Sequence, residues 1–505
     1  MSGFVVGLGN ADRRAVEAML ERVAHRGRHF SGVWQRDSVI MAQNYLRADA
    51  DATEIGSGIP AGYRGSISLC YDGQLGNAMP EPAEVRQGLA EEAFLISLYR
   101  REGINMLSRL DDAIYTFAVS DGKRLLAARD LLGIKTLFWG RKNGALYLAS
   151  ELKSLAACME DVHEFPPGHC MDESGTLSRY AQLPSEPPAQ EVSDIAASTQ
   201  EIRRIIQRNI RSRVSFKRPT GGLLSGGMDS SVVCLLASQR LREMKGPEAR
   251  LRTFAVGVGE SGDIVNSRLV ARRIQSDHRE VIVTPEQVLE VLPEVIYYLE
   301  SFDPSLVRSS ATNYLVSRAA GEEGVEVLLS GEGGDELFCG YAYFKSFPVE
   351  KLFGRQMECL GYLHNNASLR LDRMNQAHSI KVVAPLVSGD LLRYAMRIPA
   401  QHKLKPQEGK PQETGRMEKW ILRKAFEPDL PPEITWRGKQ EFSQGSGSAA
   451  LLESFFEEEI AEPEFRKARR EFPFLRSKEE LFYFRIFTDH FGRGKAVETV
   501  GVWPH

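Results

Sequence analysis

Two short turns rich in glycine and serine carry the residues of this chain that are best suited to chemistry. The first turn, SGGMDSS at residues 225–231, contains two glycines, three serines and one aspartate. The second turn, SGEGGDE at residues 330–336, has a similar composition and again carries an aspartate. Backbone N–H groups of such turns can point together at one anion, and glycine lets the anion approach closely. The two turns therefore predict an anion-binding site.

The first turn stands between a predicted strand, TGGLLS, and a predicted helix, SSVVCLLASQRL. A helix amino terminus has a positive partial charge and free N–H groups, so it stabilises a phosphate. The hydroxyl groups of Ser225, Ser230 and Ser231 add hydrogen-bond donors. Asp229 would repel a bare phosphate, and its presence is understood if a divalent metal ion lies between the two.

The spacing differs from the GxxxxGK[ST] phosphate loop because no lysine follows the glycines, and it resembles the SGGxDS loop of the ATP pyrophosphatase family. In the second turn, Ser330, Gly331, Gly333 and Gly334 again suit a phosphate, and Asp335 again suits a metal ion. Turns at the carboxyl ends of strands in one parallel sheet face the same crevice. We therefore predict one shared nucleotide site.

Strands and helices alternate around both turns, which predicts a parallel α/β domain over residues 195–505. Residues 1–182 instead contain short strand-like runs separated by turn residues, with helices at Arg13–His25 and Glu91–Glu102. They predict an α+β or layered β domain. Residues 183–194, with three prolines, predict a linker, and the tail GRGKAVETVGVWPH is expected to be irregular.

The composition excludes several classes of protein. With a net charge of −3 and 42% apolar residues over 505 positions, the chain is an ordinary globular protein of two to four domains. We expect no nucleic-acid partner and no membrane association, because basic excess and a spanning apolar run are both lacking. Six scattered cysteines without CxxC spacing argue against zinc and disulfides and favour a cytoplasmic location.

The motif text resembles the asparagine synthetase B family along nearly the whole chain. The synthetase half is matched by LSGGMDSS, LSGEGGDELFCGY, TFAVGV, ESFDPSLVRSSATNYLVSR, LDRMNQAHSI, MEKWILRKAF and WRGKQEF. The glutaminase half is matched by HRG, YDGQLGN, ARDLLGIKTLF, LYLASELKSL and FPPG. The resemblance implies an Ntn-hydrolase-like αββα sandwich followed by an ATP-pyrophosphatase-like parallel α/β synthetase domain.

In that family, ATP activates a carboxylate as an acyl-adenylate, pyrophosphate leaves, and ammonia or an amine attacks the acyl carbon. The resemblance implies ATP and Mg²⁺ as cofactors, with Asp229 and Asp335 toward the metal. The implied nucleotide-binding residues are Leu224, Ser225, Gly226, Gly227, Asp229, Ser230, Ser231, Val256, Ser330, Gly331, Glu332 and Gly333. Lys439, in WRGKQEF, matches a lysine that stabilises charge on the pyrophosphate and on a tetrahedral oxyanion.

Ser305 and Arg308 match positions near the acyl substrate, where Arg308 could hold a carboxylate through two parallel hydrogen bonds or form a structural salt bridge. The family segment LExRxPFLD appears here as SIKVVAPLVSGD, so Lys381 replaces a glutamate close to the reacting centre. Lys381 could pair with a carboxylate of a substrate other than aspartate, act as a base once desolvated, or face solvent in a rebuilt pocket. Arg308 and Lys381 join Lys439 and Asp229 as catalytic candidates.

The glutaminase half departs from the family at each functional position. Ser2 stands where an N-terminal cysteine attacks glutamine, and Tyr45 replaces the arginine that binds the glutamine carboxylate. Asp72 replaces the oxyanion-hole asparagine and Ala90 replaces a binding aspartate. A carboxylate would repel the oxyanion that this position should stabilise. We therefore expect no glutamine hydrolysis and interpret the domain as a scaffold.

The leading hypothesis is an ATP-dependent ligase that joins a small-molecule carboxylate to ammonia or an amine. Relatives without the N-terminal cysteine include β-lactam synthetases and lasso-peptide cyclases, so a natural-product pathway is a suitable setting. The alternatives are an asparagine synthetase that uses ammonia or glutamine, and a pseudoenzyme that binds ATP without turning it over. The sequence leaves the oligomeric state open and is compatible with a homodimer.

Overall fold

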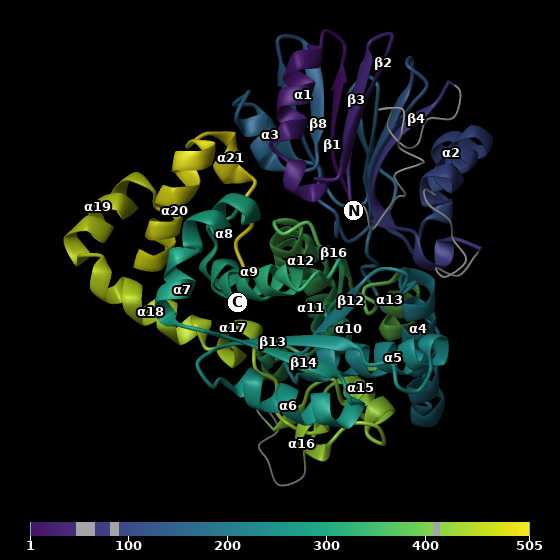
Figure 1. Ribbon diagram of the computed structural model, residues 1–505, viewed down its shortest axis with the longest axis vertical. Helices are drawn as coiled ribbons and strands as arrows, with labels where there is room; N and C mark the ends of the chain where they lie inside the picture. Colours follow the sequence, from purple (N-terminus) through teal and green to yellow (C-terminus); the bar gives the residue numbers. More distant parts are fainter. Residues whose placement is uncertain (1, 47–65, 81–89, 408–414, 504–505) are drawn as a thin grey trace.

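The chain forms an antiparallel N-terminal domain and a larger domain built on a parallel sheet (Figure 1). This computed structural model describes residues 2–46, 66–80, 90–407 and 415–503. Residues 180–194, between the two domains, contain no helix or strand. Within the described residues, no helix is both long and apolar enough to cross a bilayer.

Two antiparallel sheets make up the N-terminal domain. The first has the order β2 (Phe30–Arg36), β3 (Val39–Tyr45), β1 (Ser2–Leu8), β8 (Ala145–Ala149), β7 (Phe138–Lys142) and β9 (Val162–Glu164). The second has the order β11 (Leu177–Arg179), β10 (His169–Asp172), β6 (Leu125–Arg129), β5 (Ile114–Ser120) and β4 (Ser68–Gln74). Alternate residues of the strands bury an apolar layer between the sheets, in which Phe4, Met41 and Cys70 are fully buried.

Helices cover the outer faces of both sheets. Helix α1 (Arg13–Glu21) and helix α3 (Leu152–Ala156) pack on the first sheet, and α2 (Ala90–Glu102) packs on the second. Asp12 caps α1, because its side chain accepts a hydrogen bond from the N–H of Ala15. The result is the αββα sandwich that the resemblance implied (Figure 1).

The second domain contains a five-stranded parallel sheet. Its order is β14 (Asp277–Val283), β13 (Arg252–Val258), β12 (Thr220–Leu223), β15 (Val327–Leu329) and β16 (Lys381–Val383). Helices lie on both faces, with α4 (Ile195–Arg213), α5 (Met228–Lys245) and α6 (Gly262–Ile274) in one core and α8 (Leu292–Leu299) and α9 (Pro304–Glu322) in the other. The predicted parallel α/β fold is confirmed.

The prediction of an irregular C-terminal tail was wrong, because the tail contains the short helix α21 (Lys495–Glu498) and is packed against the domain. In the same domain, the β-branched run at Lys381–Val383 forms the edge strand β16. The stretch EQVLEVLPEVIYYLE forms two helices, α7 (Pro285–Glu290) and α8, and Pro293 stands in the first turn of α8.

The remaining helices belong to the same domain. They are α10 (Gly334–Phe338), α11 (Val349–Gly361), α12 (Ala367–Gln376), α13 (Gly389–Met396), α14 (Ala400–Lys403), α15 (Trp420–Phe426), α16 (Pro432–Thr435), α17 (Phe442–Gly445), α18 (Ser448–Glu459), α19 (Glu462–Glu471) and α20 (Lys478–Phe491). Of these, α18, α19 and α20 extend away from the sheet at the left of the view (Figure 1). A two-stranded ribbon pairs β17 (Lys405–Pro406) with β18 (Arg416–Met417).

A buried network of charged side chains joins the two domains. Its basic members are Arg26, Lys135, Lys153 and Arg373, and its acidic members are Asp72, Glu151, Glu300 and Asp372. Arg26 of the N-terminal domain donates to Asp372 of α12 at 2.8 Å, and Lys135 donates to the same carboxylate at 2.6 Å. Burial alone would raise the pKa of Asp372, but these two cations hold it below its ordinary value.

Candidate nucleotide-binding site

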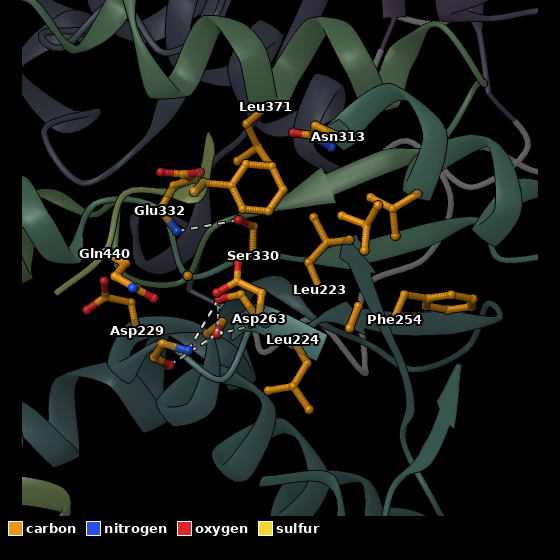
Figure 2. Close-up of a pocket in the computed structure, with 18 of the residues that line it drawn as sticks. Leu223, Leu224, Asp229, Phe254, Asp263, Asn313, Ser330, Glu332, Leu371 and Gln440 are labelled. Atoms are coloured by element: carbon orange, nitrogen blue, oxygen red, sulfur yellow. Dashed lines mark hydrogen bonds between the residues drawn. The ribbon is translucent and has the colours of Figure 1, made fainter. Parts of the chain in front are cut away.

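The two glycine-rich turns lie side by side at the carboxyl edge of the parallel sheet. Strand β12 ends at Leu223 and α5 begins at Met228, so the first turn joins them; β15 ends at Leu329 and α10 begins at Gly334. Because β12 and β15 are hydrogen-bonded neighbours, both turns open into one pocket (Figure 2). The empty volume, including the open mouth of the pocket, is about 790 Å³.

Hydrogen bonds within the first turn divide its serines into two groups. Ser225 Oγ and Ser230 Oγ lie 3.1 Å apart, and both residues line the pocket. Ser231 is fully buried and donates to the carbonyl oxygen of Gly227 at 2.7 Å, so it stabilises the start of α5 and does not line the pocket. The structure therefore assigns Ser231 a structural contact where the sequence suggested a phosphate ligand.

The glycines of the second turn are required mainly because the turns pack on each other. A Cβ atom on Gly331 would lie 2.4 Å from the backbone nitrogen of Ser230. A Cβ atom on Gly334 would lie 2.2 Å from Asp229 Oδ1. The sequence suggested instead that these glycines allow a phosphate to approach. Gly227 differs, because the nearest atom to its added Cβ is Ser225 Oγ at 3.2 Å.

Two lysines and two aspartates alternate at the polar end of the pocket. Lys419 Nζ contacts Asp229 and lies 2.6 Å from Asp335 Oδ1, and Lys439 Nζ lies 2.8 Å from Asp335 Oδ2. Burial raises the pKa of Asp229, with Lys419 opposing the shift. Burial also acts to raise the pKa of Asp335, but the two lysines together hold it below its ordinary value.

Asp229 and Asp335 also have the chemistry of magnesium ligands. No cluster of three or more metal-ligating side chains occurs among the described residues. Asp229 Oδ1 is buried and has no hydrogen-bond partner. Mg²⁺ in nucleotide sites is held by one or two carboxylates together with phosphate oxygens and water. Asp229 and Asp335 fit that donor set, so they would hold the ion when a nucleotide is bound.

The opposite end of the pocket is apolar (Figure 2). Its lining includes Leu223, Leu224, Phe254, Val256, Val316 and Leu371. Asn313 of α9 adds an amide at this end, where it can accept or donate hydrogen bonds. An apolar slot with one polar group beside a phosphate-binding turn is suited to a nucleobase.

Asp263 and Arg437 complete the wall next to the first turn. Asp263 lies in the first turn of α6 and is almost fully buried, and Arg437 Nη2 is 3.8 Å from its Oδ1. Burial raises the pKa of Asp263 to about 7, against the opposing effect of Arg437.

A second pocket adjoins the first and shares its polar end. Both are lined by Glu332, Asp335, Arg370, Lys439 and Phe442. The second pocket alone is lined by Ser305, Ser309, Tyr341, Asn366, Ala367, Glu441, Ser443 and Trp503. We call it the acyl pocket, because a carboxylate bound there lies next to a nucleotide in the first pocket.

Most residues proposed from the sequence lie together around the first pocket. Those that line it are Leu224, Ser225, Gly227, Asp229, Ser230, Val256, Ser330, Gly331, Glu332, Asp335 and Lys439. Gly226 and Gly333 do not line it, and both have a positive φ, +68° and +98° respectively. They are therefore needed for the shape of the turns.

Arg308 and Lys381 lie apart from both pockets. Arg308 donates three hydrogen bonds to the buried carboxylate of Glu479, one of them from Nε to Oε1 at 3.0 Å. This is the structural salt bridge that the sequence left as the alternative. Lys381 pairs with Val327 at the amino end of the sheet, whereas the turns lie at its carboxyl end. The structure does not place Lys381 beside the reacting centre, because a three-residue strand separates the two edges.

Several pocket residues were not proposed from the sequence: Asp263, Arg370, Arg437, Gln440 and Phe442. Lys419 was not proposed either, and it is buried behind the pocket, where it contacts Asp229 and Asp335. Lys419 stands in the motif MEKWILRKAF, where a lysine directly before an apolar helix was the available signal. Arg370 lies on α12 beside residues of the interdomain network, and no local pattern distinguishes it from the other arginines.

A carboxylate lies beside the amino terminus of β1. The backbone N–H of Ser2 donates to Asp72 Oδ1 at 3.3 Å, and Asp72 Oδ2 accepts from Arg26 at 2.7 Å. Tyr45 pairs with Ser2 across β1 and β3 and is fully buried. A carboxylate already bound by Arg26 thus lies where a hydrogen-bond donor would be needed.

Comparison with known proteins identifies relatives of both domains. Residues 201–358 and 354–500 match the family described as Asparagine synthase, and residues 1–165 match the Glutamine amidotransferase domain. The chain is 30% identical to asparagine synthetase B [glutamine-hydrolyzing] of Escherichia coli (strain K12), over 95% of this chain and 88% of the relative. It is 30% identical to asparagine synthetase [glutamine-hydrolyzing] 1 of Saccharomyces cerevisiae, over 96% and 91%, and 31% identical to the Zea mays enzyme, over 99% and 87%.

Proposed function

The chain belongs to the asparagine synthase family of AMP-forming ligases that make C–N bonds, and we propose that it adenylates a small carboxylic acid and transfers the acyl group to ammonia or an amine. One observation carries the proposal. Two turns, from β12 and β15, and Lys439, from a separate segment, converge on a pocket whose other end is apolar.

The polar end of the pocket suits the triphosphate. The hydroxyl groups of Ser225, Ser230 and Ser330 can donate to phosphate oxygens, and the amino terminus of α5 adds a positive partial charge. Magnesium held by Asp229 and Asp335 would neutralise phosphate charge when it is bound.

Lys439 is fixed where negative charge develops. Its backbone N–H donates to Glu418 Oε1 at 2.7 Å, and Glu418 is fully buried. The ammonium group therefore faces the boundary between the two pockets, where pyrophosphate would leave and an acyl oxyanion would form. A fixed ammonium stabilises both charges.

Exchange of labelled pyrophosphate into ATP tests the adenylation step. With magnesium and a carboxylic acid that is a substrate, the protein is expected to exchange pyrophosphate and to release AMP. The measurement is a panel of carboxylic acids, each assayed with ammonia, with amines and with glutamine as nitrogen source. Formation of ADP in place of AMP would contradict the proposal, and ATP binding without any exchange across the panel would favour a pseudoenzyme.

We further propose that glutamine does not supply the nitrogen. The Ser2→Ala variant is expected to keep the wild-type rate of AMP release with ammonia or an amine, because the Ser2 backbone contacts survive the change. Glutamine is expected to support no more turnover than a control without a nitrogen source. A rate that falls at least tenfold in Ser2→Ala with glutamine alone would show that the N-terminal hydroxyl is a nucleophile.

We place the protein in natural-product biosynthesis, with a substrate other than aspartate, because Ser2 replaces the N-terminal cysteine of the family and β-lactam synthetases and lasso-peptide cyclases also lack that cysteine. Asparagine formation from ammonia is the second candidate, favoured by the family match over nearly the whole chain. Pyrophosphate exchange that is clearly fastest with L-aspartate would select this second candidate.

A further inference from the structure

The cations that border the acyl pocket are already paired with carboxylates. Arg370 donates to Glu332, and its remaining buried Nε–H has no hydrogen-bond partner. Lys439 faces Asp335, and Glu441 is a third acid in the lining. The described lining therefore contains two cations and three carboxylates. A second carboxylate on the substrate would enter a site with a net negative charge, which is unfavourable at low dielectric.

Arg308, which the sequence suggested for a substrate carboxylate, cannot supply the missing positive charge to the acyl pocket. Arg308 is bound to Glu479, whose side chain is buried and also accepts from the hydroxyl of Tyr483 at 2.8 Å. Breaking such a buried pair would leave an unpaired carboxylate in the core. Within its described lining, the acyl pocket thus offers the unpartnered Nε–H of Arg370 and neutral polar groups such as those of Ser305 and Asn366, but no uncompensated positive charge.

Aromatic rings form the other part of the wall. Trp503 packs against Tyr341 with ring centres 5.8 Å apart and against Tyr362 at 5.2 Å. The ring centre of Phe442 lies 5.2 Å from the guanidinium carbon of Arg370. Trp503, Tyr341 and Phe442 all line the acyl pocket. Such rings favour a flat or apolar body over a charged one.

The C-terminal tail is held in place, so Trp503 is a fixed part of this wall. The backbone N–H of Trp503 donates to Asp303 Oδ2 at 3.3 Å, and Arg476 donates to the same oxygen at 2.8 Å. Asp303 also caps α9, the helix that presents Ser305 to the pocket. A Cβ atom on Gly501 would lie 2.6 Å from Asn365 Cβ, which shows how closely the tail is packed.

From these contacts we propose that the acyl substrate is a monocarboxylic acid with an aromatic or bulky apolar body, and that Trp503 determines this specificity. The inference rests on the proposed adenylating activity. The substrate carboxylate lies toward the nucleotide pocket and Lys439, and its body packs between Trp503 and Phe442. L-Aspartate, with a second carboxylate and no apolar body, is a poor substrate.

The test compares 3-phenylpropionate and L-phenylalanine with L-aspartate and L-glutamate in AMP release by the full-length protein. The wild-type kcat/KM is expected to be higher for an aromatic acid than for L-aspartate by at least about tenfold. Trp503→Ala is expected to lower kcat/KM for the aromatic acid by about tenfold, while Trp503→Phe retains most of that kcat/KM. The KM for ATP should change less than twofold, because Trp503 does not line the nucleotide pocket.

Val502→Ala is the matched control, because Val502 is 48% exposed and precedes Trp503 in the same tail. Preference for L-aspartate, or a Trp503→Ala variant equal to wild type with every acid, would overturn the substrate assignment and leave the ligase proposal standing. If no acid yields AMP, the ligase proposal fails.

Calorimetric titration of 3-phenylpropionate in the presence of α,β-methylene-ATP then tests whether the acyl pocket binds aromatic acids through Trp503. Weaker binding to Trp503→Ala than to the wild type supports this assignment. Equal binding, or no binding to either protein, overturns it.

Discussion

Replacement of Lys439 by alanine is expected to lower kcat for AMP formation by about 10²–10³-fold. The ammonium group lies 2.8 Å from Asp335 at the boundary of the two pockets, where charge builds on the leaving pyrophosphate. Because this charge is larger in the transition state than in bound ATP, the loss should appear in kcat more than in the KM for ATP. Steady-state AMP release with the best acid of the panel measures both constants.

The matched control for this change is Lys424→Ala. Lys424 is exposed and pairs with Glu427 on the protein surface, so its loss should leave both constants unchanged. Lys439→Arg keeps the charge but not the compact ammonium, and we expect it to recover part of the rate. A Lys439→Ala variant with wild-type kcat would remove the lysine from the proposed mechanism.

Arg26→Met is expected to lower the free energy of unfolding by about 3–5 kcal/mol. Arg26 is fully buried and donates to Asp72, Glu151 and Asp372, so its removal leaves three carboxylates with one cation fewer. Burying an uncompensated charge is far more costly than losing a surface ion pair. Urea unfolding, followed by circular dichroism at several wavelengths, measures the effect and shows whether the two domains unfold together.

Arg13→Met serves as the surface control. Arg13 pairs with Glu17 one turn along α1, and their side chains are 52% and 44% exposed. An exposed pair of this kind contributes about 0.5 kcal/mol or less. If Arg26→Met were no more destabilising than Arg13→Met, the buried network would not be the main stabilising interaction between the two domains.

The network gives the N-terminal domain a structural role that does not depend on glutamine chemistry. Asp372 and Arg373 are held by charges of the N-terminal domain, and both lie on α12. The same helix presents Arg370 and Leu371 to the nucleotide pocket. The pocket of the second domain is therefore built against the N-terminal domain.

Local sequence patterns determined those parts of the site that lie within one strand–turn–helix segment. A strand, a turn of small residues and a helix follow one another within a short stretch at Thr220–Lys245, and their periodicity and glycines are visible in the sequence. The order of strands and helices also identified the parallel sheet. Since neighbouring parallel strands end at one edge, the meeting of the two turns could be predicted as well.

Tertiary structure alone decided which charges are paired and which are available. Arg308 meets Glu479, and Lys419 lies between Asp229 and Asp335, although these partners are far apart in the chain. Trp503, in a tail expected to be irregular, became part of the wall of the acyl pocket. Periodicity and spacing record contacts along one segment, whereas the charge balance of a buried site depends on side chains that only folding brings together.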